Sequence, residues 1–225
     1  MGYLDHCGCG SYLYVFYEGD KVCCNRISGF LFYCRLWFVE LDKRVQDLQS
    51  TGMKENIKLI CFYGPESTGK TTMAIELAKL YQTEWVPEVA REFINTNDFT
   101  ADDIVKIGYA QTQRILDESK VANKILFCDS DLITTQIYSN HYLGVVPEIL
   151  YQLEKQVHYD LYFLFDIDTE WVADGLRDLG HMRKEMYEIF KNELEKRNIP
   201  YIKVQGDWEE RKQIIKHAIN LLIDK

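Results

Sequence analysis

A phosphate-binding pattern is the clearest chemical signal in the sequence. Residues 64–71 read GPESTGKT and match G-x-x-x-x-G-K-[ST] at every fixed position. The glycines of such a loop let successive N–H groups point at phosphate oxygens, and the N-terminus of the next helix adds partial positive charge. An ordinary glycine-rich turn is the alternative, but the flanking apolar strand and helix patterns favour a nucleoside triphosphate site. We expect the triphosphate to be held by Gly64, Pro65, Glu66, Ser67, Thr68, Gly69, Lys70, Thr71 and Thr72.

The loop and one later acid predict a metal site. Lys70 would reach the β and γ phosphates, and the Thr71 hydroxyl would hold Mg²⁺. Asp129 follows the apolar run ILFC, and an acid at the end of such a strand can hold the hydration shell of Mg²⁺. We therefore assign Thr71 and Asp129 to Mg²⁺. Asp131 could do the same, accept a hydrogen bond from a substrate hydroxyl, or cap the helix that starts at Leu132.

Glu88 and Arg91 are three positions apart and so share one face of a short predicted helix. A carboxylate opposite the γ phosphate can orient a sugar hydroxyl and take its proton, while an arginine can steady the transferring group. The alternative is an exposed ion pair worth less than about 1 kcal/mol. This pair is a weak signal by itself, and Asp129 or Asp131 could orient or deprotonate the hydroxyl in place of Glu88.

Residues 171–184 form a charged segment that contains Arg177 and Arg183. Small-molecule phosphotransferases keep a mobile lid at this place, whose arginines close on the phosphates and exclude water. We predict that Arg177 and Arg183 stabilise charge on the transferring group. Because acidic residues are interspersed, a solvated charged loop is the alternative.

These residues need a scaffold that brings them together, and the chain predicts one. From residue 53 onward strands and helices alternate, which is typical of a three-layer α/β fold with a central, mostly parallel sheet. Ligands of such sheets lie at the carboxyl ends of the strands, where the polar residues above occur. The predicted strands are 58–63, 84–86, 124–128, 161–165 and 201–204. The predicted helices are 72–81, 89–94, 100–121 with a capping box of Thr100 and Asp103, 132–143, 147–157, one ending near Arg197, and 208–223.

The overall composition excludes several classes of protein. The chain has 225 residues, 47% of them apolar, and a formal net charge of −9. An acidic balance argues against general nucleic-acid binding, and no apolar run is long enough to predict a transmembrane helix. Cys61 and Cys128 lie in apolar runs and resemble small buried residues of a reducing compartment. We expect a cytoplasmic protein with no nucleic-acid or membrane partner; the oligomeric state, a homo-oligomer included, stays open.

Residues 1–52 form an N-terminal extension that differs from the rest of the chain. They are rich in aromatic residues, have no clear helix or strand register before Leu36, and lack the pattern of a disordered tail or a signal peptide. Their cysteines match none of the usual zinc spacings. Either translation begins at Met53, or these residues form a small β-rich appendage that ends in a helix over 36–48. We divide the chain into this extension and a main domain, residues 53–225.

Five motifs in order and spacing resemble the ribosylnicotinamide kinase domain of NadR-type proteins, in the P-loop NTPase superfamily. They are GPESTGKTT, WVPEVAREF, GYAQ at 108–111, CDSDLITTQIY and EWVADGLRDLG. Only the first is widely shared among unrelated NTPases, and the resemblance covers about residues 57–222. It implies a P-loop kinase-like fold with a lid. It also implies transfer of the ATP γ phosphate to the 5′-hydroxyl of nicotinamide riboside, which yields nicotinamide mononucleotide for NAD salvage.

The resemblance implies roles for single residues as well. Lys70 and Thr71 would serve ATP and Mg²⁺, and Arg177 and Arg183 would belong to the lid. The residues around the riboside would be Glu88, Arg91, Asp129 and Asp131.

The chain also departs from the family pattern. Larger members look as if an aromatic residue precedes the glutamate where this chain has Pro87. The residue that stacks on the nicotinamide ring is therefore open, and Trp85 and Trp171 are our candidates. Full-length NadR carries an adenylyltransferase domain and often a helix-turn-helix upstream, and neither fits into residues 1–52.

Two other functions remain open at this point. The same scaffold with a different base pocket would be another nucleoside or deoxynucleoside kinase. The chain could also be a non-catalytic ATP-binding module, in which the nucleotide regulates an interaction with a partner; this function is not enzymatic.

Overall fold

The computed structural model describes residues 12–17, 20–25, 57–174 and 176–223. The chain divides into two compact units, Met1–Ser50 and Thr51–Lys225. In the first unit, strands β1 (Tyr12–Tyr17) and β2 (Asp20–Asn25) pair antiparallel. This pair agrees with the β-rich alternative and corrects our statement that no strand register precedes Leu36. The predicted helix over 36–48 and the predicted start at Met53 lie outside the described residues.

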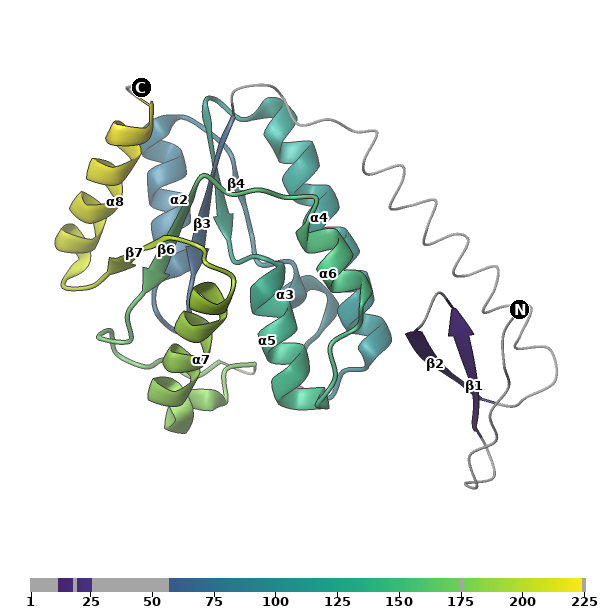
Figure 1. Cartoon of the computed structure of the whole chain (residues 1–225). Coiled ribbons are helices and arrows are strands. Elements are labelled where there is room, and N and C mark those ends of the chain that lie inside the picture. The colour runs from purple at the N-terminus through teal and green to yellow at the C-terminus, as the bar shows by residue number, and fades with distance from the viewer. Residues whose placement is uncertain (1–11, 18–19, 26–56, 175, 224–225) are drawn as a thin grey trace. The chain divides into compact units, whose positions relative to one another are not determined.

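The second unit is built on a five-stranded parallel sheet (Figure 1), with the order β4-β5-β3-β6-β7. Each predicted strand is present, with boundaries that shift by at most one residue. Because β3 is central, the loops after β3, β5 and β6 emerge side by side at one edge of the sheet. The strands are β3 (Lys58–Tyr63), β4 (Trp85–Val86), β5 (Ile125–Asp129), β6 (Leu161–Phe165) and β7 (Tyr201–Val204).

The helices also follow the predicted positions. The capping box is confirmed, since the Asp103 N–H donates to the Thr100 hydroxyl and the Thr100 N–H donates to the Asp103 carboxylate. The prediction of a helix over 147–157 is too long, because the chain turns beyond Glu154 with tighter bonds such as Gln156 N–H to Leu153 C=O. The helices are α2 (Lys70–Tyr81), α3 (Ala90–Phe93), α4 (Ala101–Val121), α5 (Leu132–Leu143), α6 (Ile149–Glu154), the 3₁₀ turn η1 (Leu179–Met182), α7 (Arg183–Lys196) and α8 (Trp208–Ile223).

Alternation along the central strand produces the three layers. Ile60 and Phe62 of β3 pack with α2 and α8 on one face of the sheet. Cys61 and Tyr63 point to the opposite face and pack with α5 and α7. Burial on both faces explains why these strands read as continuous apolar runs, and the predicted three-layer α/β fold is confirmed. None of the helices in the described part is long and apolar enough to cross a membrane.

Candidate active site

The loop after β3 has the backbone that its glycines predict. Gly64 and Gly69 adopt φ angles of +134° and +87°, which side-chain-bearing residues rarely reach. A Cβ on Gly64 would also lie 3.0 Å from the Phe165 carbonyl oxygen. Helix α2 begins directly at Lys70 without a side-chain cap, so its first N–H groups are available to an anion. The loop therefore has the geometry of a nucleotide phosphate-binding loop.

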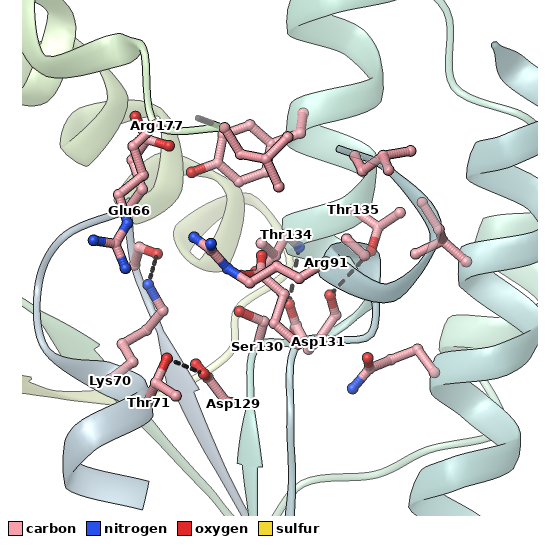
Figure 2. Close-up of a pocket in the computed structure, with 18 of the residues that line it drawn as sticks. Glu66, Lys70, Thr71, Arg91, Asp129, Ser130, Asp131, Thr134, Thr135 and Arg177 are labelled. Carbon is pink, nitrogen blue, oxygen red and sulfur yellow. Dashed lines mark hydrogen bonds and ion pairs between the residues drawn. The ribbon is translucent and has the colours of Figure 1, made fainter. Parts of the chain in front are cut away.

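Lys70 lies inside this loop and is buried. Its ammonium group donates to the Gly64 and Pro65 carbonyl oxygens at 2.8 Å each, and the Thr68 hydroxyl donates to the same Pro65 carbonyl at 2.9 Å. Burial lowers the pKa of Lys70. The side chain is thus held beside the loop carbonyls, at the edge of the cavity drawn in Figure 2.

Thr71 and Asp129 meet across the mouth of the loop (Figure 2), where the Thr71 hydroxyl donates to the Asp129 carboxylate at 2.5 Å. The other carboxylate oxygen, Oδ1, is buried and has no hydrogen-bond partner among the described residues. Burial raises the pKa of Asp129 to about 6. A hydroxyl, a carboxylate with a free oxygen and an adjacent phosphate loop suit Mg²⁺, which takes few protein ligands and keeps water and phosphate oxygens.

Asp131 is buried and is the N-cap of α5. Its Oδ1 accepts from the Thr134 N–H at 2.9 Å and from the Thr134 hydroxyl at 3.0 Å, and its Oδ2 accepts from the Tyr162 hydroxyl at 3.0 Å. Of the alternatives for this residue, the structure contains the helix cap. A substrate contact of Asp131 stays a prediction.

Glu88 and Arg91 line the cavity together and bond to each other at 3.3 Å. Arg91 also donates to Asp174 at 3.0 Å, and Asp174 pairs with Arg177 at 3.2 Å. The pair is therefore part of a chain of charges that links α3 to the segment between β6 and α7. Glu88 and Arg91 thus form the ion pair that we gave as the alternative, and both residues also line the cavity.

The segment between β6 and α7 is tied to the phosphate loop. The Thr169 hydroxyl and the Arg183 guanidinium donate to the Ser67 carbonyl, at 3.0 and 3.3 Å, and the Val172 N–H donates to the Ser67 hydroxyl at 2.9 Å. On the same segment, the Leu179 N–H donates to the Glu66 carboxylate at 3.0 Å. The segment lies where a lid is expected; Arg177 lines the cavity, whereas Arg183 does not.

The two predicted tryptophans lie outside the cavity. Trp85 lies on the edge strand β4. Successive side chains of a strand point to opposite faces of the sheet, so Val86 points toward α4 and Trp85 packs on the face that α2 covers. Trp171 packs against Gly180 and under the Arg183 guanidinium, 5.6 Å from its ring centre. Stacking of either ring on a ligand in this cavity is not supported by the geometry.

Aromatic side chains that we did not predict form the cavity wall instead. Phe99 and Tyr142 pack edge to face at 5.5 Å, and Tyr138 stacks with Tyr142 at 6.3 Å. All three line the cavity, but in the sequence they resemble ordinary core residues. Further polar lining residues to which we gave no role are Asn97, Gln111, Ser130, Thr134 and Thr135. All of these except Asn97 lie in motifs that we quoted, Gln111 in GYAQ and the other three in CDSDLITTQIY.

A protein-family model described as an AAA domain matches residues 59–211. The chain belongs to this family. The chain is also 32% identical over 160 residues to the trifunctional NAD biosynthesis/regulator protein NadR of Escherichia coli (strain K12), across 67% of this chain and 39% of that protein. Its identity to the NadR of Salmonella typhimurium (strain LT2) is 32% over 164 residues, across 69% and 40%. The resemblance to NadR-type proteins is confirmed, and the chain spans about two fifths of these relatives.

Solved structures show the same fold. A NadR protein in complex with NR matches with a TM-score of 0.65 and 23% identity, over 74% of this chain and 51% of that one. A deoxyadenosine kinase from M. mycoides matches with a TM-score of 0.56 and 14% identity, over 72% and 99%. At these identities the likeness is one of fold, and it places this AAA-family chain among P-loop kinase folds.

Proposed function

We propose that residues 53–225 form a kinase that transfers the γ phosphate of ATP to the 5′-hydroxyl of nicotinamide riboside and produces nicotinamide mononucleotide. The observation that carries this proposal is that one cavity contains two different halves. The phosphate loop, through residues 64 and 66–72, lines one half, and Glu88, Arg91 and the aromatic wall of Phe99, Tyr138 and Tyr142 line the other. A cavity of this kind suits a triphosphate donor and a small ring-containing acceptor.

The reaction follows from the groups between the two halves. The acceptor hydroxyl oxygen forms a bond to the γ phosphorus, and the bond from that phosphorus to the β–γ bridging oxygen breaks, so that its electron pair leaves on ADP. Glu88 takes the proton of the hydroxyl and returns it to solvent. The N–H groups of the loop, Lys70 and Arg177 stabilise the charge on the transferring group.

Thr71 and Asp129 would hold Mg²⁺ in this scheme. When bound there, the ion neutralises charge on the β and γ phosphates. Arg91 and Asp131 line the cavity, and in this proposal they lie beside the acceptor sugar. Arg183 supports the phosphate loop through the Ser67 carbonyl, which is an indirect role in place of the direct one that we first assigned.

The identity of the acceptor is supported by chemistry and by relatives. Nicotinamide riboside is a cation with a flat ring, and the aromatic wall with the nearby Glu88 suits a cation. The curated relatives are named for NAD biosynthesis, and a NadR structure contains NR. Another NadR structure contains NAD and AMP-PNP, which supports ATP as the donor.

A panel of acceptors tests the proposal. Release of ADP from Mg·ATP is measured with nicotinamide riboside, with purine nucleosides, with pyrimidine nucleosides and without acceptor. The proposal requires strong stimulation by nicotinamide riboside. Stimulation by the other nucleosides alone would make the chain a different nucleoside kinase, and release that no acceptor stimulates would favour a regulatory ATP-binding module.

A further inference from the structure

We infer that Gln111 recognises the base of the acceptor by donating a hydrogen bond from its side-chain nitrogen, Nε2. With nicotinamide riboside, the oxygen of the ring carboxamide is the group that would accept this bond. The inference rests on the proposed function and deepens it, because it names the substituent of the ring that the enzyme recognises.

Gln111 lies on the face of α4 that lines the cavity. Ile104, Ile107 and Gln111 follow one another at helical spacing, and all three are lining residues. The Gln111 side chain is only 4% exposed. It is therefore a buried polar group on the same face of the helix as Ile104 and Ile107, which pack in one hydrophobic cluster with Phe99.

The orientation of the Gln111 amide is fixed by chemistry. Its oxygen, Oε1, accepts from the backbone N–H of Val89 at 3.0 Å. A backbone N–H can only donate, so the amide cannot be turned around without losing this bond. The amino group must then be the part that is left for another partner.

Nε2 has no hydrogen-bond partner among the described residues, although it is buried. Buried donors in folded proteins are nearly always satisfied, and this one belongs to a residue that lines the proposed acceptor half. A ligand that places an oxygen or a ring nitrogen acceptor there satisfies it. A ligand without such an acceptor leaves the donor unpaired, and sites of this kind reject analogues strongly.

The bond to Val89 gives Gln111 a second, positioning effect. Val89 follows Glu88, the residue proposed to take the proton. Gln111 therefore fixes the backbone beside Glu88 with its oxygen while its nitrogen faces the ligand. One side chain therefore both recognises the ring of the acceptor and positions the general base Glu88. The test must separate these two effects.

The test compares two acceptors of equal charge, nicotinamide riboside and N-ribosylpyridinium, which lacks the carboxamide. The kcat/KM of each is measured for the wild type, for Gln111→Glu and for Gln111→Met. Gln111→Glu keeps an oxygen for the Val89 N–H and removes the donor, whereas Gln111→Met removes both. Gln113→Met, on the exposed face of the same helix, is the matched control.

We expect Gln111→Glu to lose about tenfold or more in kcat/KM for nicotinamide riboside, with much less change for N-ribosylpyridinium. Gln111→Met should lose activity on both acceptors, because the bond to Val89 is also gone, and should lose more on nicotinamide riboside. Equal losses of Gln111→Glu for the two acceptors, or no loss, would overturn the inference and leave the proposed function intact. If the wild type phosphorylates a different nucleoside, the same variants are compared on that nucleoside and on its analogue without the base carbonyl. Absence of phosphorylation of every riboside would contradict the proposed function itself and the inference with it.

Discussion

The Thr71 hydroxyl donates to the Asp129 carboxylate at 2.5 Å and so joins the start of α2 to the carboxyl end of β5. The two residues are far apart in the sequence, and parallel pairing of β3 with β5 brings them together. The second oxygen of Asp129 remains buried without a partner among the described residues. This geometry suits a cation beside the phosphate loop, and the proposed role of Mg²⁺ depends on it.

Asp129→Asn tests that role. Asparagine keeps an oxygen that accepts from Thr71 but has no negative charge for a cation. We expect kcat with Mg·ATP to fall by about 100-fold or more, while binding of ATP without metal changes little. Titration calorimetry with and without Mg²⁺ gives the second result. Asp117→Asn, on the exposed face of α4, should leave both unchanged; a normal kcat for Asp129→Asn would remove the residue from the site.

Glu88→Gln separates proton transfer from binding. Glutamine keeps the size of the side chain and can still accept from Arg91, which bonds to Glu88 at 3.3 Å. We expect kcat to fall by about 100-fold or more because the general base is lost, with ATP affinity intact. Single-turnover rates and equilibrium ATP binding check the two parts. Near-normal turnover would exclude Glu88 as the base.

Asp174→Asn weakens the contact between α3 and the segment after β6. Asp174 bonds to Arg91 at 3.0 Å and to Arg177 at 3.2 Å, but more than a third of its side chain is exposed, so solvent screens the pair. We expect KM for the acceptor to rise a few-fold, about fivefold at most, with a smaller change in kcat. Limited proteolysis should cut the segment faster. The exposed Glu170 of the same segment gives the control, Glu170→Gln. If Asp174→Asn and Glu170→Gln have the same KM for the acceptor, the contact of Asp174 with Arg91 and Arg177 has no part in acceptor binding.

The capping box of α4 makes a prediction about pH. Hydrogen bonds from the Thr100 side chain and backbone, and then from Lys106, lower the pKa of Asp103 to about 2. Because the folded pKa is below the unfolded value of 3.8, ionised Asp103 stabilises the fold above that value, and the effect is lost as the pH falls toward 2. Urea unfolding should show Asp103→Ala less stable than wild type at pH 7 and pH 5, with a smaller difference at pH 3. A difference that does not change with pH would show that ionisation of Asp103 has no part in it.

The fold could be predicted because its signals are local. The three central strands, β3, β5 and β6, are short apolar runs that are buried on both faces, and Thr100 and Asp103 mark the start of α4 with a recognisable pattern. The phosphate loop was equally clear. Its positive φ angles require glycine at positions 64 and 69, and Lys70 follows at the fixed position of the motif. The end of α6 was missed because a few turn hydrogen bonds decided it, and these leave no strong sequence pattern.

The acceptor half could be predicted only in part, because it is assembled from distant segments. Tyr138 and Tyr142 have the spacing of core residues, and only the packing of α5 against Phe99 turns them toward the cavity. Trp85 was a poor candidate since a two-residue edge strand gives no reliable indication of which face a side chain takes. Arg183 was assigned to the phosphates from its charge and its place in the predicted lid segment, but its position at the start of α7 directs it to the Ser67 carbonyl.

The most direct test of the central claim is to identify the product. The protein is incubated with Mg·ATP and nicotinamide riboside, and the products are analysed by mass spectrometry and phosphorus NMR. The account predicts one ADP for each nicotinamide mononucleotide, with the new phosphate on the 5′ oxygen. Formation of ADP and free phosphate with unchanged riboside would contradict it.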